Sequence, residues 1–282
     1  MSTSYSPSEM IAVMTAKEIA DGEIVFVGIG LPMVGAILAK QTHAKSMKIS
    51  FESGILGGEP VGAATTVSDG VCCHNAIMFC STWQTFADLG RGYFDTVLIG
   101  GAQIDKFGNS NATAIIGGQS YERPVARLPG SGGANDAGTL GNCKVILVTP
   151  LQRRRFPEHV DYITTPGYIN GPHKREELGL EGGPAAVITD KCIFRFNKAS
   201  GEMFLDTLYP GVSVEEIRKE VQWDLDVPKE LKLASPPTIQ EIELVRKIDP
   251  TDIYGLRGTK TFNELSREKW SELLLQGWSY WK

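Results

Sequence analysis

A strand, a glycine turn, a helix and a second strand follow one another in a single stretch of the sequence, and this order restricts the fold more than any other feature. The apolar run EIVFVGIG breaks at Gly28 and Gly30. Pro32 is typical of a first helical residue, and the helix is predicted to reach about Gln41, after which KISF at 48–51 forms the next strand. Such a unit is a parallel crossover, so we expect an α/β fold.

Capping boxes and apolar runs predict the elements outside this unit. A Ser or Thr three residues before a Glu marks helix starts after Ser6, Ser213 and Thr238, and the first of these helices is predicted to cover 7–20. The segment 61–93 is too irregular for a prediction. Buried strands are expected at 96–105, 111–116, 144–150, 184–190, 191–196 and 202–209, with a hairpin turn at 199–201 between the last two.

Length and charge limit the class of protein. The 282 residues, of which 42% are apolar, suffice for one large α/β domain or two small ones. The net charge of -5 gives no general attraction to nucleic acid or to an anionic membrane, so we expect a small-molecule or protein partner. The N-terminus lacks a basic stretch followed by an apolar core, and no apolar run reaches membrane-spanning length. We therefore expect a cytoplasmic protein with no membrane contact.

The cysteines predict neither disulfides nor a metal site. Cys72, Cys73, Cys80, Cys143 and Cys192 form an odd set without the paired spacing of zinc ligands. The two adjacent cysteines are poorly placed to bind one metal ion. We expect all five to be buried, reduced thiols.

Glu52 stands directly after the short strand at 48–51, which is the end of a strand where α/β folds gather their ligands. Gly54, Gly57 and Gly58 follow, and glycines would let the backbone pass close to a bound molecule. A carboxylate in this place has three interpretations: a nucleophile, a ribose ligand or a solvated strand end. This stretch alone leaves all three open.

Three other kinds of site find less support in the sequence. Gly28, Gly30 and an acid about twenty residues later resemble a dinucleotide-binding fingerprint, but the third glycine of that fingerprint falls on Met33. A hydrolase triad has little support, because the chain holds four histidines and no serine in a G-x-S-x-G motif. A thiol nucleophile beside His74 would depend on sequence adjacency, which does not establish a hydrogen-bonded pair.

A carboxylate nucleophile is consistent with the scarcity of histidine. A glutamate side chain is ionised at neutral pH and needs no general base to activate it. It does need backbone N–H groups directed at the oxyanion that forms when an acyl carbonyl is attacked. The loop at 128–138 offers bare backbone at Gly130, Gly132 and Gly133. Two glycine loops and an acid at a strand end favour this interpretation over flexible turns.

Seven sequence blocks then carry a resemblance to a known family. They are, in chain order, KEIADGEIVFVGIGLPMVGAILAK, FESGILGG, IGGAQIDKFGN, GSGGAN, VDYITTPGYINGP, VITDKCIFRF and WDLDV. From about residue 8 to 250 the chain resembles the β subunits of glutaconate coenzyme A transferases, which are class I coenzyme A transferases. The resemblance implies an open, mostly parallel sheet with helices on both faces and a β-subunit domain at 1–251. The apolar extension at 252–282 is expected to be helical and docked.

The resemblance also implies a reaction and its site. The glutamate of the E-S-G motif, here Glu52, attacks an acyl-coenzyme A thioester, and a glutamyl thioester of coenzyme A forms through a mixed anhydride. Gly133 matches the position whose N–H helps form the oxyanion hole. Coenzyme A is then a substrate, and no permanently bound cofactor is expected. The remaining residues assigned to coenzyme A and acyl binding are Ser53, Gly54, Gly101, Gln103, Gly132 and Asn135.

Partner and substrate follow from the same resemblance. Enzymes of this type pair the β chain with an α subunit, and the site lies between the two, so this chain should be inert alone. Some relatives are decarboxylases or carbon-carbon hydrolases of acyl-coenzyme A compounds, and a dinucleotide-binding module is a third alternative. The acid substrate and the number of αβ pairs stay open. Arg153, Arg154 and Arg155 form either a phosphate patch or a solvated face.

Overall fold

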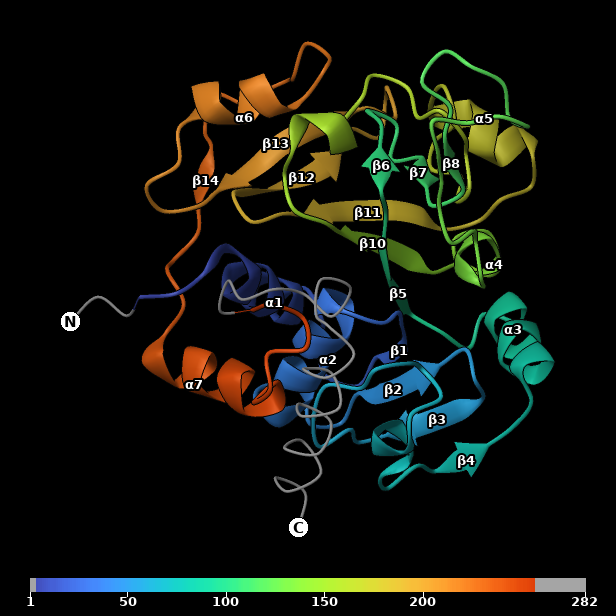
Figure 1. Cartoon of the computed structure of the whole chain (residues 1–282), viewed down its shortest axis with the longest axis vertical. Coiled ribbons are helices and arrows are strands. Elements are labelled where there is room, and N and C mark those ends of the chain that lie inside the picture. Colours follow the sequence, from blue (N-terminus) through green and yellow to red (C-terminus); the bar gives the residue numbers. More distant parts are fainter. Residues whose placement is uncertain (1–3, 257–282) are drawn as a thin grey trace.

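The structure of the protein is a computed structural model that describes residues 4–256, and its main element is a ten-stranded sheet (Figure 1). The strand order is β14-β13-β12-β11-β10-β5-β1-β2-β3-β4. The strands of this sheet are β1 (Ile24–Val27), β2 (Lys48–Phe51), β3 (Ile55–Gly58), β4 (Met78–Phe79), β5 (Thr96–Gly100), β10 (Lys144–Val148), β11 (Gly183–Ile188), β12 (Cys192–Phe196), β13 (Met203–Leu208) and β14 (Lys232–Leu233). Two small sheets pair β6 (Gln103–Ile104) with β7 (Ser110–Asn111) and β8 (Ala114–Ile115) with β9 (Ala126–Arg127).

The five central strands of the large sheet are parallel, as the crossover unit predicts. They follow the order β11-β10-β5-β1-β2, and antiparallel strands extend the sheet on both sides. The chain leaves β1 for β2 on one side and later returns to β5 on the other. The strand order therefore reverses between β1 and β5, and such a reversal opens a crevice at the carboxyl ends of the strands.

Helices cover both faces of the sheet, as expected. They are α1 (Pro7–Lys17), α2 (Leu31–Gln41), α3 (Thr82–Gly90), α4 (Ala134–Ala137), α5 (Pro172–Glu177), α6 (Val214–Glu220) and α7 (Ile239–Ile248), with short 3₁₀ turns η1 (Gly70–Cys73) and η2 (Arg153–Arg155). The capping boxes predicted at Ser6, Ser213 and Thr238 are all present. The first helix ends at Lys17, earlier than predicted.

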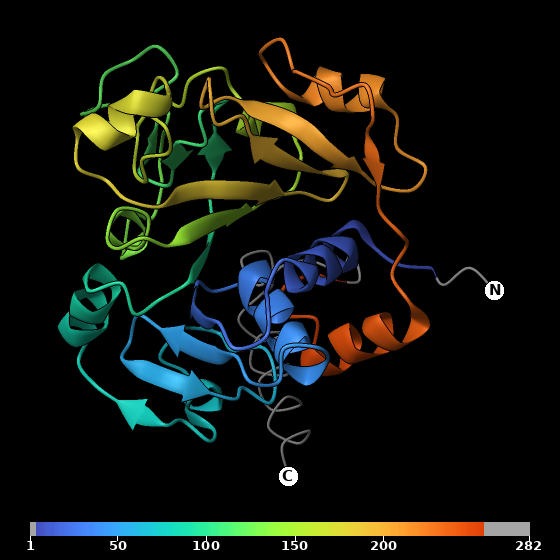
Figure 2. The ribbon, with the colours of Figure 1, turned by 180° about the vertical axis from the view of Figure 1, so that it is seen from behind.

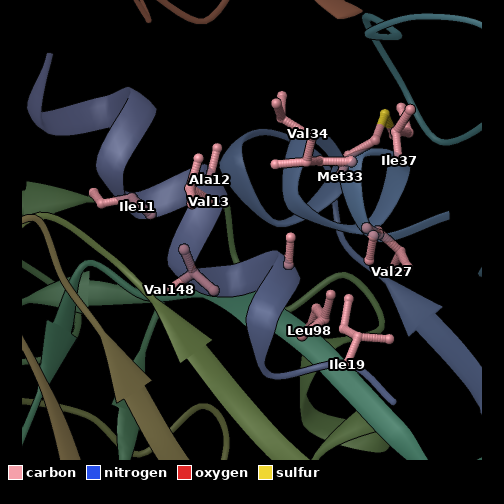
Figure 3. Packing of buried hydrophobic residues seen from close by; sticks show 14 of the residues in the cluster. Ile11, Ala12, Val13, Ile19, Val27, Met33, Val34, Ile37, Leu98 and Val148 are labelled. Carbon is pink, nitrogen blue, oxygen red and sulfur yellow. The ribbon is translucent and has the colours of Figure 1, made fainter. Parts of the chain in front are cut away.

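One core lies between the sheet and the helices α1, α2 and α7. Helix α7 is far from α1 and α2 in the sequence but lies beside both (Figures 1 and 2). Gly35 is required here, because a Cβ atom would lie 2.6 Å from the Thr15 side chain of α1. Figure 3 shows the packing of Ile11, Ala12, Val13, Met33, Val34 and Ile37 from the two helices with Val27, Leu98 and Val148 from the sheet.

A second core covers the opposite face. Alternate residues of the buried strands point to opposite sides, so Phe26 faces this core while Val25 and Val27 face the first. Helices α3, α4 and α6 contribute Leu89, Ala137 and Ile217 to it. Because both faces are covered, the central strands read as continuous apolar runs.

Two of the predicted strands are each broken into two separate strands. The expected strand at 96–105 ends at Gly100, and β6 belongs to a different sheet. The chain leaves the large sheet at Gly101, where a Cβ atom would lie 2.4 Å from the Ser110 hydroxyl oxygen. The expected strand at 111–116 is broken because the Asn111 side chain accepts a 2.9 Å hydrogen bond from the Thr113 N–H. This local bond competes with strand pairing.

The glycines after Glu52 pack against the chain itself. They were expected to leave room for a ligand, but a Cβ atom on Gly54 would lie 1.8 Å from the Cys80 carbonyl oxygen, and one on Gly58 would lie 2.4 Å from that of Cys72. They permit β3 and its neighbours to approach closely. Strand β3 was missed because its glycines resemble a turn, and α3, η1 and β4 lie in the segment left without a prediction.

The predicted helical extension at 252–282 lies outside the described residues from 257 onwards. Its first residues pack into the first core, where Leu256 is buried and its carbonyl accepts a hydrogen bond from the Ser6 hydroxyl. The Tyr254 hydroxyl donates to the Ala64 carbonyl. No helix within 4–256 combines the length and apolar character needed to cross a bilayer.

All five cysteines are free thiols, and three of them are buried. Burial raises the pKa of Cys72 to about 12 and that of Cys143 to about 11, and it raises the pKa of Cys192 as well. Cys73 and Cys80 are only partly buried, so the expectation of five buried thiols was wrong for these two.

Thiol alkylation should separate these two groups. At about pH 8, iodoacetamide should modify Cys73 and Cys80 in the native protein and leave Cys72, Cys143 and Cys192 unmodified, because burial suppresses both access and thiolate formation. Peptide mass spectrometry provides the measurement, with the protein unfolded in guanidinium as the control in which all five react. If Cys192 of the native protein reacted as fast as Cys192 of the unfolded protein, the buried position of this thiol would be contradicted.

Candidate active site

The candidate site lies at the carboxyl ends of β1, β2 and β5. Glu52 directly follows β2, Gly28 directly follows β1, and Gly100 is the last residue of β5. This is the edge of the sheet where the strand order reverses, and it is the place where open α/β sheets bind ligands. Helices α3 and α4 lie side by side at the same edge (Figures 1 and 2).

An open groove of about 510 Å³ runs over these strand ends. Its size falls in the range of small-molecule sites. Strand ends form its floor, and two loops at 65–67 and 129–134 form its walls. The described residues that line it are Phe26, Gly28, Ile29, Glu52, Thr65, Thr66, Val67, Ile99, Gly100, Pro129, Gly130, Ser131, Gly132, Gly133 and Ala134.

The Glu52 carboxylate is partly buried and directed at the loop opposite. A Cβ atom on Gly133 would lie only 2.7 Å from Glu52 Oε2. Within residues 4–256 the carboxylate has no hydrogen-bond or ion-pair partner. A carboxylate that is only partly solvated and has no cation beside it keeps its lone pairs free for a reacting group.

The glycine loop that lines the groove contains backbone donors without acceptors. In the part of the chain that the structure describes, the N–H groups of Gly132 and Gly133 donate to no acceptor. Gly133 is also buried, and a buried N–H without a partner is uncommon in folded proteins. The loop is held by hydrogen bonds of 2.9 Å from the Gly130 N–H to the Ala112 carbonyl and 2.8 Å from the Ala134 N–H to the Ser131 carbonyl.

Side chains fix the other wall of the groove. The Ser53 hydroxyl donates to the Val67 carbonyl at 2.7 Å. Asp69 Oδ2 accepts hydrogen bonds of 3.1 Å from the Thr65 N–H and 3.0 Å from its hydroxyl. The residue next to the candidate nucleophile therefore ties the 65–67 loop to the end of β2.

Three of the predicted site residues line the groove: Glu52, Gly132 and Gly133. The other five do not. Ser53 is bonded to the 65–67 loop and Gly54 faces Cys80, as described above. The remaining three are Gly101, Gln103 and Asn135.

Gln103 and Gly101 each form hydrogen bonds within the protein. Gln103 Oε1 accepts hydrogen bonds of 2.7 Å from Asn111 Nδ2 and 3.1 Å from the Asp161 N–H. The Gly101 carbonyl accepts from the Thr149 hydroxyl at 3.2 Å. Their assignment to coenzyme A or acyl binding stays a prediction.

Sequence reasoning missed one wall and the residue behind the glycine loop. The 65–67 loop and Phe86 both lie in the segment left without a prediction. Phe86 packs behind Gly133, because a Cβ atom there would lie 2.2 Å from Phe86 Cζ. The tight spacing of Phe86, Gly133 and Glu52 comes from three distant parts of the chain, and no local pattern signals it.

The basic run at 153–155 is partly structural. Arg153 Nη1 donates to the carbonyls of Lys219 and Val221, and Arg155 Nη1 donates to the carbonyl of Gly101 at 3.3 Å. Burial and the neighbouring Arg154 lower the pKa of Arg155. Among the described residues, no three His, Cys, Asp or Glu side chains are grouped to hold a metal ion.

The fold and the site define an α/β protein with a carboxylate and a bare glycine loop at the strand ends, and comparison identifies its family. Residues 8–220 match the family described as Coenzyme A transferase. The chain is 39% identical over 258 residues to one of the subunits of the glutaconate CoA-transferase of Acidaminococcus fermentans, with coverage of 88% of this chain and 94% of that one. It is 35% identical over 250 residues to the corresponding chain of the 3-oxoadipate CoA-transferase of Pseudomonas knackmussii, with coverage of 88% and 94%.

The solved structures agree with the sequence comparison. The crystal structure of the glutaconate coenzyme A-transferase from Acidaminococcus fermentans matches with a TM-score of 0.83 and 35% identity, over 89% of this chain and 98% of that one. The chain belongs to the coenzyme A transferase family, and it is a subunit of a CoA-transferase enzyme. The resemblance to the glutaconate type and the predicted sheet architecture are confirmed.

Gly133→Ala should abolish most transferase activity. The new methyl group would have to share space with Glu52 Oε2 and Phe86 Cζ, so either the carboxylate or the ring must move. Displacing a reacting group or an oxyanion donor reduces kcat by about 10²-fold or more. Steady-state exchange assays on the assembled enzyme provide the measurement. Gly70→Ala is the matched control, because its Cβ atom meets nothing within 4 Å; equal activity of the two variants would contradict the geometry.

Proposed function

We propose that the chain is the β subunit of an enzyme that transfers coenzyme A between small carboxylic acids through a covalent intermediate on Glu52. The observation that carries this proposal is the unpartnered Glu52 carboxylate beside Gly133, in a loop where the N–H groups of Gly132 and Gly133 have no acceptor within the described part of the chain. A nucleophile and an oxyanion site thus face each other in one groove at the carboxyl ends of the strands.

The reaction proceeds in balanced acyl-transfer steps. One Glu52 oxygen attacks the thioester carbonyl of the acyl-coenzyme A, and the coenzyme A thiolate leaves as a mixed anhydride forms. The thiolate then attacks the Glu52 carbonyl carbon and releases the first carboxylate, which leaves a glutamyl-coenzyme A thioester. An incoming carboxylate reverses both steps. Splitting one transfer into two half-reactions predicts ping-pong kinetics.

The Gly133 N–H is proposed to stabilise the tetrahedral oxyanions of these steps. Each attack places negative charge on a carbonyl oxygen beside the Glu52 carboxylate, and the glycine loop faces that position without an intervening side chain. A preorganised donor of this kind contributes about 3–4 kcal/mol to transition-state stabilisation.

The acid is proposed to be a dicarboxylic acid. Both named relatives carry the names of acids of this class, glutaconate and 3-oxoadipate, and these acids differ in chain length. The groove is open, and its loops carry few charged groups. It therefore accommodates an acyl chain, but its described residues offer no cation that would bind a distal carboxylate. We assign recognition of the distal carboxylate to the α subunit.

Trapping separates this function from the alternatives. The assembled enzyme is incubated with acyl-coenzyme A and no acceptor and then reduced with borohydride, which converts a thioester to an alcohol. A modified Glu52 peptide supports the transferase. Unmodified Glu52 with intact coenzyme A binding favours a decarboxylase or carbon-carbon hydrolase, and fluorescence quenching by NAD would favour a dinucleotide-binding module.

Glu52→Gln should remove exchange while the fold and coenzyme A binding are retained. The amide has the same shape but is a poor nucleophile, so kcat should fall by at least about 10³-fold. Glu59→Gln is the matched control: Glu59 lies on the same stretch, pairs with Lys40 at 3.1 Å and does not line the groove. Exchange by Glu52→Gln at the wild-type rate would refute the proposed nucleophile.

The proposed α subunit covers an apolar surface next to the site. Ile77, Phe79 and Trp83 are 64%, 63% and 70% exposed and lie on or beside the edge strand β4. Exposed apolar side chains on an open sheet edge mark an interaction surface. Strand β4 is anchored to the active-site turn by a 2.8 Å hydrogen bond from the Cys80 N–H to the Gly54 carbonyl.

The isolated chain should show no exchange activity, and the α subunit should restore it. Phe79→Asp should weaken assembly by at least about tenfold, because it places a charge in an apolar contact. Analytical ultracentrifugation measures the association. Leu233→Asp serves as the control, since Leu233 is also exposed but lies at the opposite edge of the sheet. Full activity of the chain alone would contradict the partner proposal.

A further inference from the structure

The guanidinium of Arg175 is buried and bonded to backbone carbonyls. Its side chain belongs to α5, and the residue is 3% exposed. Within residues 4–256 it forms no ion pair with a carboxylate. Burying a charge without a counter-ion is costly unless hydrogen bonds replace its hydration. Its hydrogen bonds run from Nε to Gly182 at 3.0 Å, from Nη1 to Pro166 at 2.8 Å and Gly167 at 3.2 Å, and from Nη2 to Gly138 at 3.0 Å and Glu181 at 2.7 Å.

These carbonyls come from three separate segments of the chain. Gly138 is the C-cap of α4, Pro166 and Gly167 lie in a connecting loop, and 181–182 directly precede β11. The planar fork of an arginine reaches all three segments at once. One side chain therefore fixes the end of α4 relative to the sheet and to the connecting loop.

The connecting loop holds the other end of α4. Thr165 precedes the two loop carbonyls, and its hydroxyl donates to the Ala134 carbonyl at 3.0 Å. Its methyl group also packs on Gly138, where a Cβ atom would lie 2.0 Å from Thr165 Cγ2. Both ends of the single-turn helix α4 are thus held through Arg175, directly at Gly138 and through Thr165 at Ala134.

The position of α4 determines the position of Gly133. Gly133 is the N-cap of α4, and its carbonyl accepts a 2.9 Å hydrogen bond from the Ala137 N–H. Any tilt or slide of α4 would therefore move the Gly133 N–H relative to Glu52. We propose that Arg175 is a positioning residue for the transferase reaction, which aligns the Gly133 N–H with the oxyanion formed at Glu52. The proposal rests on the function proposed above.

A kinetic comparison of two arginine variants tests this role. Lysine has a single compact ammonium group and cannot reach all five carbonyls, so Arg175→Lys should lower kcat by about 10–100-fold. The KM for acyl-coenzyme A should stay within about two-fold, because ground-state binding does not use the oxyanion contact. Assays are run on the assembled enzyme well below its melting temperature.

Arg195→Lys is the matched control. Arg195 is a partly buried arginine of β12 that pairs with Glu18 at 2.6 Å and Asp206 at 3.9 Å, and within the described residues it has no hydrogen bond to α4 or its loop. A purely structural arginine of this kind should lower the melting temperature and leave kcat unchanged. Unchanged kcat in folded Arg175→Lys, or a rise in KM alone, would overturn the proposal.

Thr165→Val provides a second variant in case Arg175→Lys does not fold. It preserves side-chain shape and removes only the hydrogen bond to Ala134, so kcat should fall by about 3–10-fold with KM unchanged. Unchanged kcat in this variant would also overturn the role of Arg175.

Borohydride trapping of wild-type enzyme is run in parallel. Absence of a Glu52 thioester there would refute the proposed function itself, whereas a trapped thioester with unchanged variant kinetics refutes only the role of Arg175.

Discussion

The close contact between the Glu52 carboxylate and the bare backbone of Gly133 is the constraint on which the site depends. The two groups approach so closely that no side chain fits between them, and Phe86 closes the space behind the glycine. Under the proposed mechanism, a carbonyl that reacts at Glu52 lies beside this glycine, whose backbone N–H has no acceptor among the described residues. The rest of the structure can be understood as the means of holding these two groups at a fixed separation.

The strand order brings the necessary segments together. Because the strand order reverses between β1 and β5, the carboxyl ends of β1, β2 and β5 border one crevice. Two separate apolar cores hold these strands from both faces, so the floor of the groove is rigid. The glycine loop is not part of the sheet, and it depends on α4, Thr165 and Arg175 for its position.

Local sequence signals predicted much of this arrangement. The capping boxes at Ser6, Ser213 and Thr238, the strand that ends at Phe51 and the loop around Gly133 depend on neighbouring residues, so the sequence reveals them. Gln103 was assigned to the site from the family resemblance, and the structure places it after the break at Gly101, where its side chain is hydrogen-bonded to Asn111 and Asp161. Contacts such as Phe86 with Gly133 join segments far apart in the chain, and only the tertiary structure establishes them.

The division of the groove into a floor of strand ends and walls of loops has a consequence for how such an enzyme can diversify. Glu52 is anchored at the end of β2, whereas residues 65–67 and 129–131 belong to connecting segments that tolerate replacement. Substitutions in these segments would alter the width and polarity of the groove while the Glu52 carboxylate stays in place. A single catalytic framework can thereby serve acids of different length, and selectivity evolves independently of the chemistry.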